Sequence, residues 1–194
     1  MFSDLNTLLQ SIGLIGICAI IFIESGFPFG FFLPGDTLLF TAGLLAAQGH
    51  FNIALAIILI FASSVAGVTI GYFSGKQLGK RFIKQEGGFL FRHEYVEKAT
   101  AFYDKHGGKA IILGRFVPAV RSFVPIVAGV AKMPYHKLMI YNTIGALIWA
   151  TLIPLIGFYA GGWLEQRGIS IDAFILPIIG MIIIISLLGP IIHA

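Results

Sequence analysis

The sequence predicts an all-α polytopic membrane protein, and three observations lead to this fold class. Of the 194 residues, 57% are hydrophobic and 11% are charged, whereas soluble domains carry about 25% charged residues. Three apolar segments are each long enough to cross a hydrocarbon core of about 30 Å. Two further apolar stretches are too short or too interrupted to cross it, and these predict re-entrant helical hairpins.

The first interrupted stretch occupies residues 12–47. Its opening apolar run, Ile12–Ile23, would form only about 18 Å of helix. Pro28, Pro34 and Gly35 then separate this run from the next apolar residues. Proline breaks helices, and freed backbone groups at membrane depth are tolerated only inside protein or beside water. We therefore expect a hairpin that enters and leaves the membrane on the same side.

The second interrupted stretch occupies residues 110–131, and its predicted breaks are Pro118 and Pro125. Two prolines so close together should interrupt a helix. A half-helix is expected to begin near Pro125, with the positive end of its dipole available to an anion. This stretch is the second predicted re-entrant hairpin.

Uninterrupted spans are predicted at residues 53–75, 138–160 and 171–192. A single span separates the two hairpins, so the hairpins should open on opposite faces of the membrane. Interrupted segments at matching places in two halves are typical of inverted-repeat transporters. We predict one membrane domain over residues 1–194, with an inverted repeat and one additional span.

The connection at residues 76–109 contains eight of the thirteen Lys and Arg residues. Short basic loops stay in the cytoplasm, which places this loop inside, the C-terminus inside and the N-terminus outside. If Ile12–Leu33 instead crosses the membrane completely, the N-terminus lies inside. Apolar residues recur at helical spacing over residues 89–106, which predicts an amphipathic helix at the membrane interface; the alternative is a solvated connector helix. Acidic residues interrupt the basic cluster, so nucleic acid is not an expected partner.

Four ionisable side chains lie inside the interrupted stretches, namely Glu24, Asp36, Arg115 and Arg121. A charge at the bilayer centre costs about 2.5–3.5 kcal/mol on the insertion scale. Such residues persist when they are paired, face a cavity or perform a function. If the hairpin tips meet, the four side chains converge on one polar site; the structural alternative is a pair of salt bridges that holds the tips together.

The residue types suggest separate tasks within that site. The guanidinium groups of Arg115 and Arg121 can bind a phosphate bidentately. A low dielectric favours the neutral form of a carboxyl group, so Glu24 and Asp36 are the candidates for proton coupling. A carboxylate that alternates between a protonated and an arginine-paired state could release the arginines for an anionic substrate.

Other motifs favour packing over chemistry. Glycines at every fourth position form a small-residue ridge, consisting of Gly67, Gly71, Gly75 and Gly79. Such a ridge lets another helix approach closely, either within a protomer or between protomers of a homo-oligomer. The histidines are scattered and Cys18 is the only cysteine, so we expect no metal site, no disulfide and no cofactor. Asn142 is interpreted as a helix–helix contact, and Trp149 as an interfacial aromatic residue.

Three motifs together resemble the DedA family of bacterial inner-membrane proteins, which is related to the eukaryotic VTT-domain (SNARE-associated) lipid scramblases. They are the run from Glu24 to Asp36, the glycines from Gly71 to Gly79, and the segment Gly114-Arg-Phe-x-Pro-x-x-Arg121. The resemblance implies two opposed re-entrant loops in the inner (cytoplasmic) membrane. It also implies translocation of undecaprenyl phosphate or phospholipids, linked to the proton motive force.

The leading functional hypothesis is a proton-coupled flippase for a lipid with a phosphate headgroup. The resemblance implies that the arginines bind the phosphate and that the acids couple to protons. One alternative is a proton-coupled antiporter of small cations or drugs, another is a non-selective phospholipid scramblase, and a third is an assembly factor that thins the bilayer. An enzyme is not expected, because a phosphatidate-phosphatase-type site needs histidines and neither interrupted stretch contains one.

Overall fold

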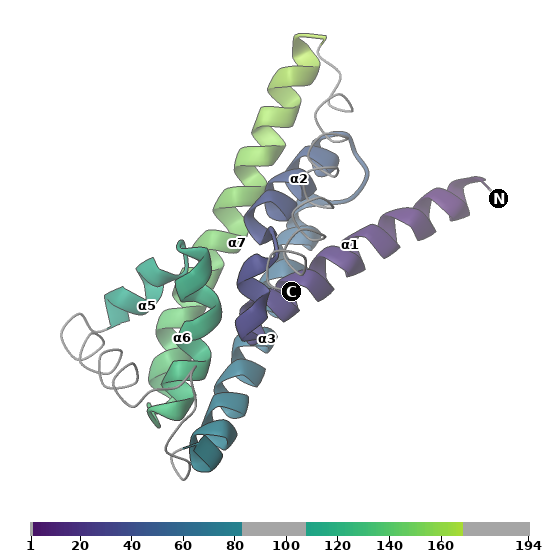
Figure 1. The fold of residues 1–194 in the computed structure, drawn as a ribbon. Helices are drawn as coiled ribbons and strands as arrows, with labels where there is room; N and C mark the ends of the chain where they lie inside the picture. The colour runs from purple at the N-terminus through teal and green to yellow at the C-terminus, as the bar shows by residue number, and fades with distance from the viewer. Residues whose placement is uncertain (1, 83–107, 169–194) are drawn as a thin grey trace. The chain divides into compact units, whose positions relative to one another are not determined.

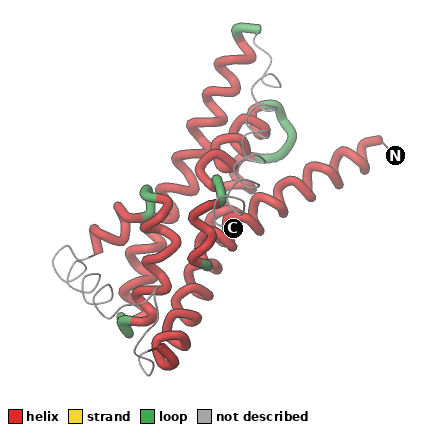
Figure 2. Tube along the Cα trace, in the orientation of Figure 1, coloured by secondary structure: helices red, strands yellow, loops and turns green. Residues whose placement is uncertain are grey.

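The computed structural model describes residues 2–82 and 108–168, and the regular structure in these ranges is entirely helical (Figures 1 and 2). The elements in chain order are α1 (Phe2–Gly26), the 3₁₀ helix η1 (Pro28–Phe32), α2 (Gly35–Ala47), α3 (Ile53–Phe82), α5 (Gly108–Gly114), α6 (Pro118–Val130) and α7 (Tyr135–Gln166). The all-α fold class is therefore confirmed for the described residues. The predicted span 171–192 and the predicted amphipathic helix 89–106 lie outside them.

Two of the described helices are long and apolar enough to cross a membrane. They are α3 over Ile53–Gln77 and α7 over Tyr135–Gln166, which correspond to two of the three predicted spans. Both helices expose many large apolar side chains, including Leu55, Ile58, Ile70 and Phe73 on α3 and Ile140, Ile144, Leu147, Leu152 and Ile156 on α7. Apolar faces of this extent suit a lipid solvent better than water.

Helix α1 is longer than the sequence suggested. The predicted first arm began at Ile12, because polar residues precede it, but the helix begins at Phe2 and has 25 residues. Polar side chains end an apolar run without ending a helix, since helix continuity depends on backbone hydrogen bonds. The ten additional residues make α1 as long as a membrane span, at about 1.5 Å per residue.

The chain divides into two compact units, and each is described by itself. The first unit comprises Met1–Ile21, Phe32–Ala62 and Ala150–Ala194; the second comprises Phe22–Phe31 and Ser63–Trp149. The second unit therefore contains the end of α1, most of α3, all of α5 and α6, and the first half of α7. It contains three of the four ionisable residues that the sequence singled out.

In the second unit, the glycines of α3 lie directly against neighbouring backbone. A Cβ added to Gly67 would overlap the carbonyl of Phe22 on α1, and one added to Gly75 would overlap the carbonyl of Ile126 on α6. A Cβ on Gly71 would lie 2.9 Å from the carbonyl oxygen of Gly26. Three of the four ridge glycines thus allow α1 and α6 to approach α3 closely, as the packing hypothesis required.

In the first unit, a similar contact joins α2 and α7. A Cβ added to Gly43 would overlap the carbonyl of Pro154, and one added to Gly157 would overlap the carbonyl of Phe40. The side chains around this contact are apolar, with Leu44 almost fully buried. This unit is therefore held together by close backbone approach and apolar packing.

Candidate functional site: a buried arginine cluster

The break between α5 and α6 positions Arg115. The residue before a proline disfavours the helical region, and Val117 accordingly has an extended backbone with φ −110° and ψ 111°. The end of α5 tightens at this point, since the Arg115, Phe116 and Val117 amides bond to carbonyls three residues earlier. Helix α6 then begins at Pro118. Arg115 therefore projects from the interruption itself, as the sequence predicted for this stretch.

Arg121 and Ser122 follow in the opening turns of α6, where the Arg121 amide bonds to the Val117 carbonyl at 2.9 Å. The predicted second break, Pro125, is wrong: Pro125 lies inside the continuous helix α6. Its ring packs against Gly71 of α3, where an added Cβ would lie 3.2 Å from the Pro125 Cβ. Proline is tolerated within helices that pack against neighbours in membrane proteins, so the half-helix begins at Pro118 and not near Pro125.

Glu24 lies in the last turn of α1, just before the chain folds back. The Phe27 amide bonds to the Ile23 carbonyl, and the Gly30 amide bonds to the Phe27 carbonyl, both at 3.0 Å. A Cβ on Gly30 would overlap the Glu24 Cα, so this turn needs glycine to pass so close to the helix end. The turn shields Glu24, whose side chain is 1% exposed.

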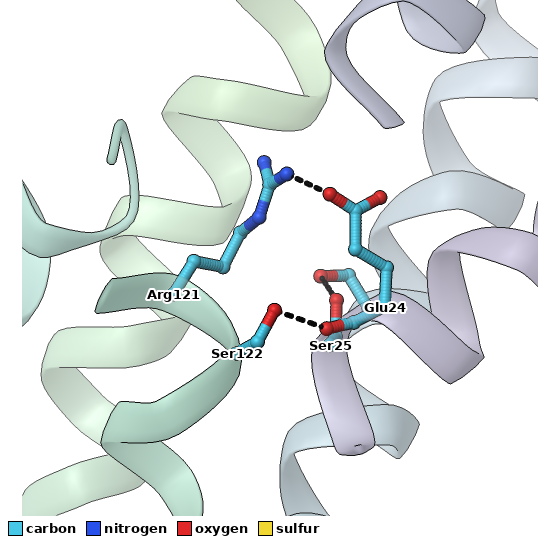
Figure 3. Close-up of polar contacts among 5 residues, drawn as sticks. Glu24, Ser25, Arg121 and Ser122 are labelled. Atoms are coloured by element: carbon cyan, nitrogen blue, oxygen red, sulfur yellow. Dashed lines mark hydrogen bonds and ion pairs between the residues drawn. The ribbon is translucent and has the colours of Figure 1, made fainter. Parts of the chain in front are cut away.

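Two contacts join Glu24 to α6 (Figure 3). Arg121 Nη2 donates to Glu24 Oε1 in a buried ion pair. Ser122 Oγ donates to the backbone carbonyl oxygen of Glu24 at 2.8 Å. Beside them, the hydroxyls of Ser25 and Ser64 share a hydrogen bond at 3.1 Å. Consecutive residues of α6 therefore hold both the side chain and the backbone of Glu24.

Arg115 is held by α7 instead. Its Nη1 donates to Asn142 Oδ1, and its guanidinium carbon lies 5.5 Å from the centroid of the Trp149 ring. The guanidinium carbon of Arg121 lies 4.4 Å from the same centroid. Both distances are within the range of a cation–π interaction. Trp149 is fully buried, so the two arginines converge on one aromatic ring.

The arginine cluster consists of Arg115, Arg121, Glu24, Asn142 and Trp149. It contains more positive than negative charge. Arg115 and Arg121 are 2% and 3% exposed, and Glu24 is the only acidic residue in the described part of the second unit. Within the described residues, Arg115 Nε and Nη2 have no hydrogen-bond partner. Buried charge of one sign is costly unless it is compensated, so this arrangement is suited to an anion.

The remaining predicted site residues lie at the ends of helices. Pro28 opens η1, Pro34 is the N-cap residue of α2, and Gly35 begins α2. Asp36 stands in the first turn of α2, where a carboxylate complements the helix dipole. It belongs to the first unit, and its convergence with the arginines stays a prediction. Gly79 lies in α3, and its contacts fall outside the described side chains.

Two residues of the cluster were not predicted from the sequence. Asn142 was interpreted as a helix–helix contact and Trp149 as an interfacial aromatic; both are buried, and both contact Arg115. Trp149 is therefore not at a helix end but inside the second unit. The available signal was their spacing, because residues seven apart lie on one face of a helix.

The chain is similar to a described family over most of its length. The VTT domain model matches residues 33–159. Protein DedA of Escherichia coli (strain K12) is 41% identical over 144 residues, which are 73% of this chain and 66% of that protein. Inner membrane protein YghB of the same strain is 33% identical over 142 residues, which are 72% of this chain and 64% of that protein.

A mycobacterial relative extends the likeness. An uncharacterized membrane protein of Mycobacterium tuberculosis (strain H37Rv) is 37% identical over 158 residues, which are 80% of this chain and 69% of that protein. The alignments with the two E. coli proteins span slightly less than two-thirds of those proteins' lengths. No solved structure matches the chain significantly.

Proposed function

Because the chain belongs to the VTT-domain (DedA) family of membrane proteins, we propose that it is a flippase for a lipid with a phosphate headgroup. The proposed substrate is undecaprenyl phosphate, and the proposed driving force is the proton motive force across the bacterial inner membrane. The observation that carries the proposal is the buried arginine cluster, in which Arg115 and Arg121 lie with Glu24, the one acidic residue in the described part of the second unit.

The geometry of Arg115 supports phosphate as the ligand. Its Nε and Nη2 atoms have no partner among the described residues, and together they form one edge of the planar guanidinium group. That edge matches two oxygens of a phosphate in a bidentate arrangement. The first turn of α6 adds the positive end of a helix dipole, because no side chain caps it at Val117.

Glu24 supplies a route for proton coupling. Its carboxylate is paired with Arg121, and protonation would remove the negative charge and weaken that pair. Arg121 would then be available to the phosphate beside Arg115. We propose that proton uptake by Glu24 and phosphate binding are linked in this way, with Asp36 as a second proton-coupling residue from the first unit.

The lengths of three helices, α2, α5 and α6, support the proposed re-entrant hairpins, whereas the 25-residue α1 is long enough to cross the membrane. Helices α2 and α6 have 13 residues each and α5 has seven, so none spans a hydrocarbon core of about 30 Å at about 1.5 Å per residue. We propose that α1–η1–α2 and α5–α6 are the two hairpins of an inverted repeat. The 76–109 loop would face the cytoplasm, and a headgroup would reach the arginines while its tails stay in lipid.

The charge of the cluster favours this function over cation antiport. In a cation antiporter the carboxylates would carry the substrate, whereas the described part of the second unit holds two buried guanidiniums and one buried carboxylate. Non-selective scrambling of phospholipids would use the same phosphate contacts. Substrate selectivity therefore separates a flippase from a scramblase.

Headgroup translocation in proteoliposomes tests the proposal. Undecaprenyl phosphate and phosphatidylglycerol would be compared, each with and without a pH gradient, for the wild type and for Arg115→Ala and Glu24→Gln. We expect translocation of undecaprenyl phosphate that responds to the gradient. Arg115→Ala should abolish it, and Glu24→Gln should remove its dependence on the gradient.

Other outcomes would change the assignment. Equal movement of both lipids, with or without a gradient, would identify a scramblase. Absence of movement in a protein shown to be folded by circular dichroism and gel filtration would contradict lipid transport. Competition by small cations but not by undecaprenyl phosphate would indicate the antiporter.

A further inference from the structure

Three buried donors belong to Arg115 and Asn142, two side chains that are hydrogen-bonded to each other. Within the described residues, Arg115 Nε, Arg115 Nη2 and Asn142 Nδ2 have no hydrogen-bond partner. The two side chains are 2% and 4% exposed, and they are joined by the bond from Arg115 Nη1 to Asn142 Oδ1. Buried donors are almost always satisfied, so the group that they suit is one rich in acceptor atoms.

Chemistry determines which atom of the Asn142 amide faces Arg115 Nη1. An arginine side chain can only donate, so the atom that accepts from Nη1 must be the carbonyl oxygen. The two ends of an amide cannot be told apart by shape, but this partner assigns them. Nδ2, with two hydrogens to donate, is the remaining end of the same planar group, next to Arg115.

Resting on the proposed function, we propose that Asn142 is a phosphate-binding residue that selects phosphate monoesters over phosphodiesters. Arg115 Nε and Nη2 would bind two terminal oxygens as a fork. Asn142 Nδ2 would donate to a third terminal oxygen, which a monoester has and a diester lacks. These three donors belong to Arg115 and Asn142 alone, so the proposed selection does not need Arg121, which is paired with Glu24.

Binding of soluble probes to the full-length protein in detergent tests this inference. Farnesyl phosphate is the monoester, farnesyl methyl phosphate the diester, inorganic phosphate the headgroup alone and farnesol the tail alone. The chain contains three asparagines, Asn6, Asn52 and Asn142. Labelling with [¹⁵N]asparagine therefore gives three side-chain amide signals, and single Asn→Asp variants assign them.

The variant Asn142→Asp separates binding from positioning. Its carboxylate still accepts from Arg115 Nη1 but can no longer donate, and it adds a negative charge beside Arg115. Binding as tight as in the control would therefore exclude Asn142 as a donor to the phosphate, and weaker binding supports a donor only together with a shift of the Asn142 amide signal. The matched control is Asn52→Asp, since Asn52 is an exposed residue whose Oδ1 accepts from the Ala54 and Leu55 amides, and aspartate serves there equally well.

We expect farnesyl phosphate to shift the Asn142 side-chain amide signal, and farnesol to leave it unchanged. Loss of one hydrogen bond to a charged group predicts binding about tenfold weaker or more in Asn142→Asp. In wild type, the diester should bind about tenfold less tightly than the monoester. A similar shift with inorganic phosphate would identify free phosphate as a ligand of the same site.

Two results would overturn the inference, and they differ from failure of the proposed function. If farnesyl phosphate binds but leaves the Asn142 signal unmoved, Asn142 is not a ligand. If Asn142→Asp binds as tightly as Asn52→Asp, its role is positioning. In both cases phosphate binding by the cluster stands. If no phosphate probe binds the folded wild type, the proposed function itself fails and the inference fails with it.

Discussion

The two units are packed in the same manner but enclose different side chains. In each unit, glycines on one helix lie against the backbone of another, at Gly75 in the second unit and at Gly43 in the first. All the buried charged residues in the described chain belong to the second unit, together with four buried polar residues, namely Ser25, Ser64, Ser122 and Asn142. Thr41, the one buried polar residue among the described side chains of the first unit, bonds to a carbonyl of its own helix.

This difference distinguishes the glycine contacts, which serve helix packing, from the buried charges, which are candidates for function. Close approach through glycine is common to both units, so it explains how the helices fit together and not what the protein does. Buried charges are costly, and among the described residues they occur in only one unit. Matched substitutions in the two units test whether the second behaves as a coupled charged cluster while the first behaves as an apolar core.

The largest expected effect concerns the Glu24–Arg121 pair. Glu24→Ala or Arg121→Ala alone should lower the free energy of unfolding by about 3–5 kcal/mol, because each leaves a buried charge without its partner. The double variant should recover a substantial part of this loss. Unfolding by SDS, followed by circular dichroism, measures the three values; strictly additive effects would show that the two residues are not coupled.

Trp149 and Trp163 provide the next comparison. Each ring contacts an arginine, but Trp149 is buried under two of them, whereas Trp163 is half exposed and contacts Arg167 at 4.0 Å. Trp149→Leu should cost about 2–4 kcal/mol through lost packing and lost cation–π contacts. Trp163→Leu should change the unfolding free energy little. Equal losses in the same SDS titration would contradict the assignment of Trp149 to the cluster.

Glycine substitutions should affect both units alike. Gly75→Ala and Gly43→Ala should each cost about 1–3 kcal/mol, since the new Cβ would meet backbone that must shift. Gly162→Ala is the control, because nothing lies within 4 Å of the added Cβ, and alanine is favoured over glycine in a helix. Thermal melts in detergent compare the three. If the Gly75→Ala protein is as stable as the Gly162→Ala protein, the close approach of α3 and α6 is contradicted.

The smallest expected difference lies between two hydroxyls. Ser122→Ala removes the donor to the Glu24 carbonyl and should cost about 1 kcal/mol. Thr41→Val should cost less, because the Thr41 hydroxyl bonds to the Thr37 carbonyl within α2, and such bonds add little to helix stability. Chemical shifts of a labelled Glu24 carbonyl should move only in Ser122→Ala. Larger destabilisation by Thr41→Val would reverse the comparison.

Much of the cluster was predictable, because ionisable residues stand out in apolar sequence. Glu24, Arg115 and Arg121 were identified from the cost of burying charge, and the structure places them in one unit. Asn142 and Trp149 were not identified, because an uncharged side chain in a long apolar helix carries little information about its depth or its partner. Only the three-dimensional contacts distinguish a ligand of Arg115 from an ordinary packing residue.

The helix boundaries likewise include some that could be predicted from the sequence and some that depend on three-dimensional contacts. Pro118 could be predicted to end α5, since the residue before a proline avoids helix. Pro125 was wrongly predicted to break the next helix, because whether proline is tolerated inside a helix depends on what packs against it, here Gly71 of α3. The early start of α1 at Phe2 was missed for a related reason, since the apolar run and the helix have different ends.

The central claim is that the buried arginines of the second unit bind the transported phosphate. Its most direct test compares Arg115→Gln with Arg167→Gln for translocation of undecaprenyl phosphate in proteoliposomes. Both changes remove one positive charge, but Arg115 is buried in the cluster and Arg167 is exposed beyond the end of α7. Loss of translocation in Arg115→Gln, with wild-type rates in Arg167→Gln, is the predicted result. Wild-type translocation by a folded Arg115→Gln protein would contradict the claim.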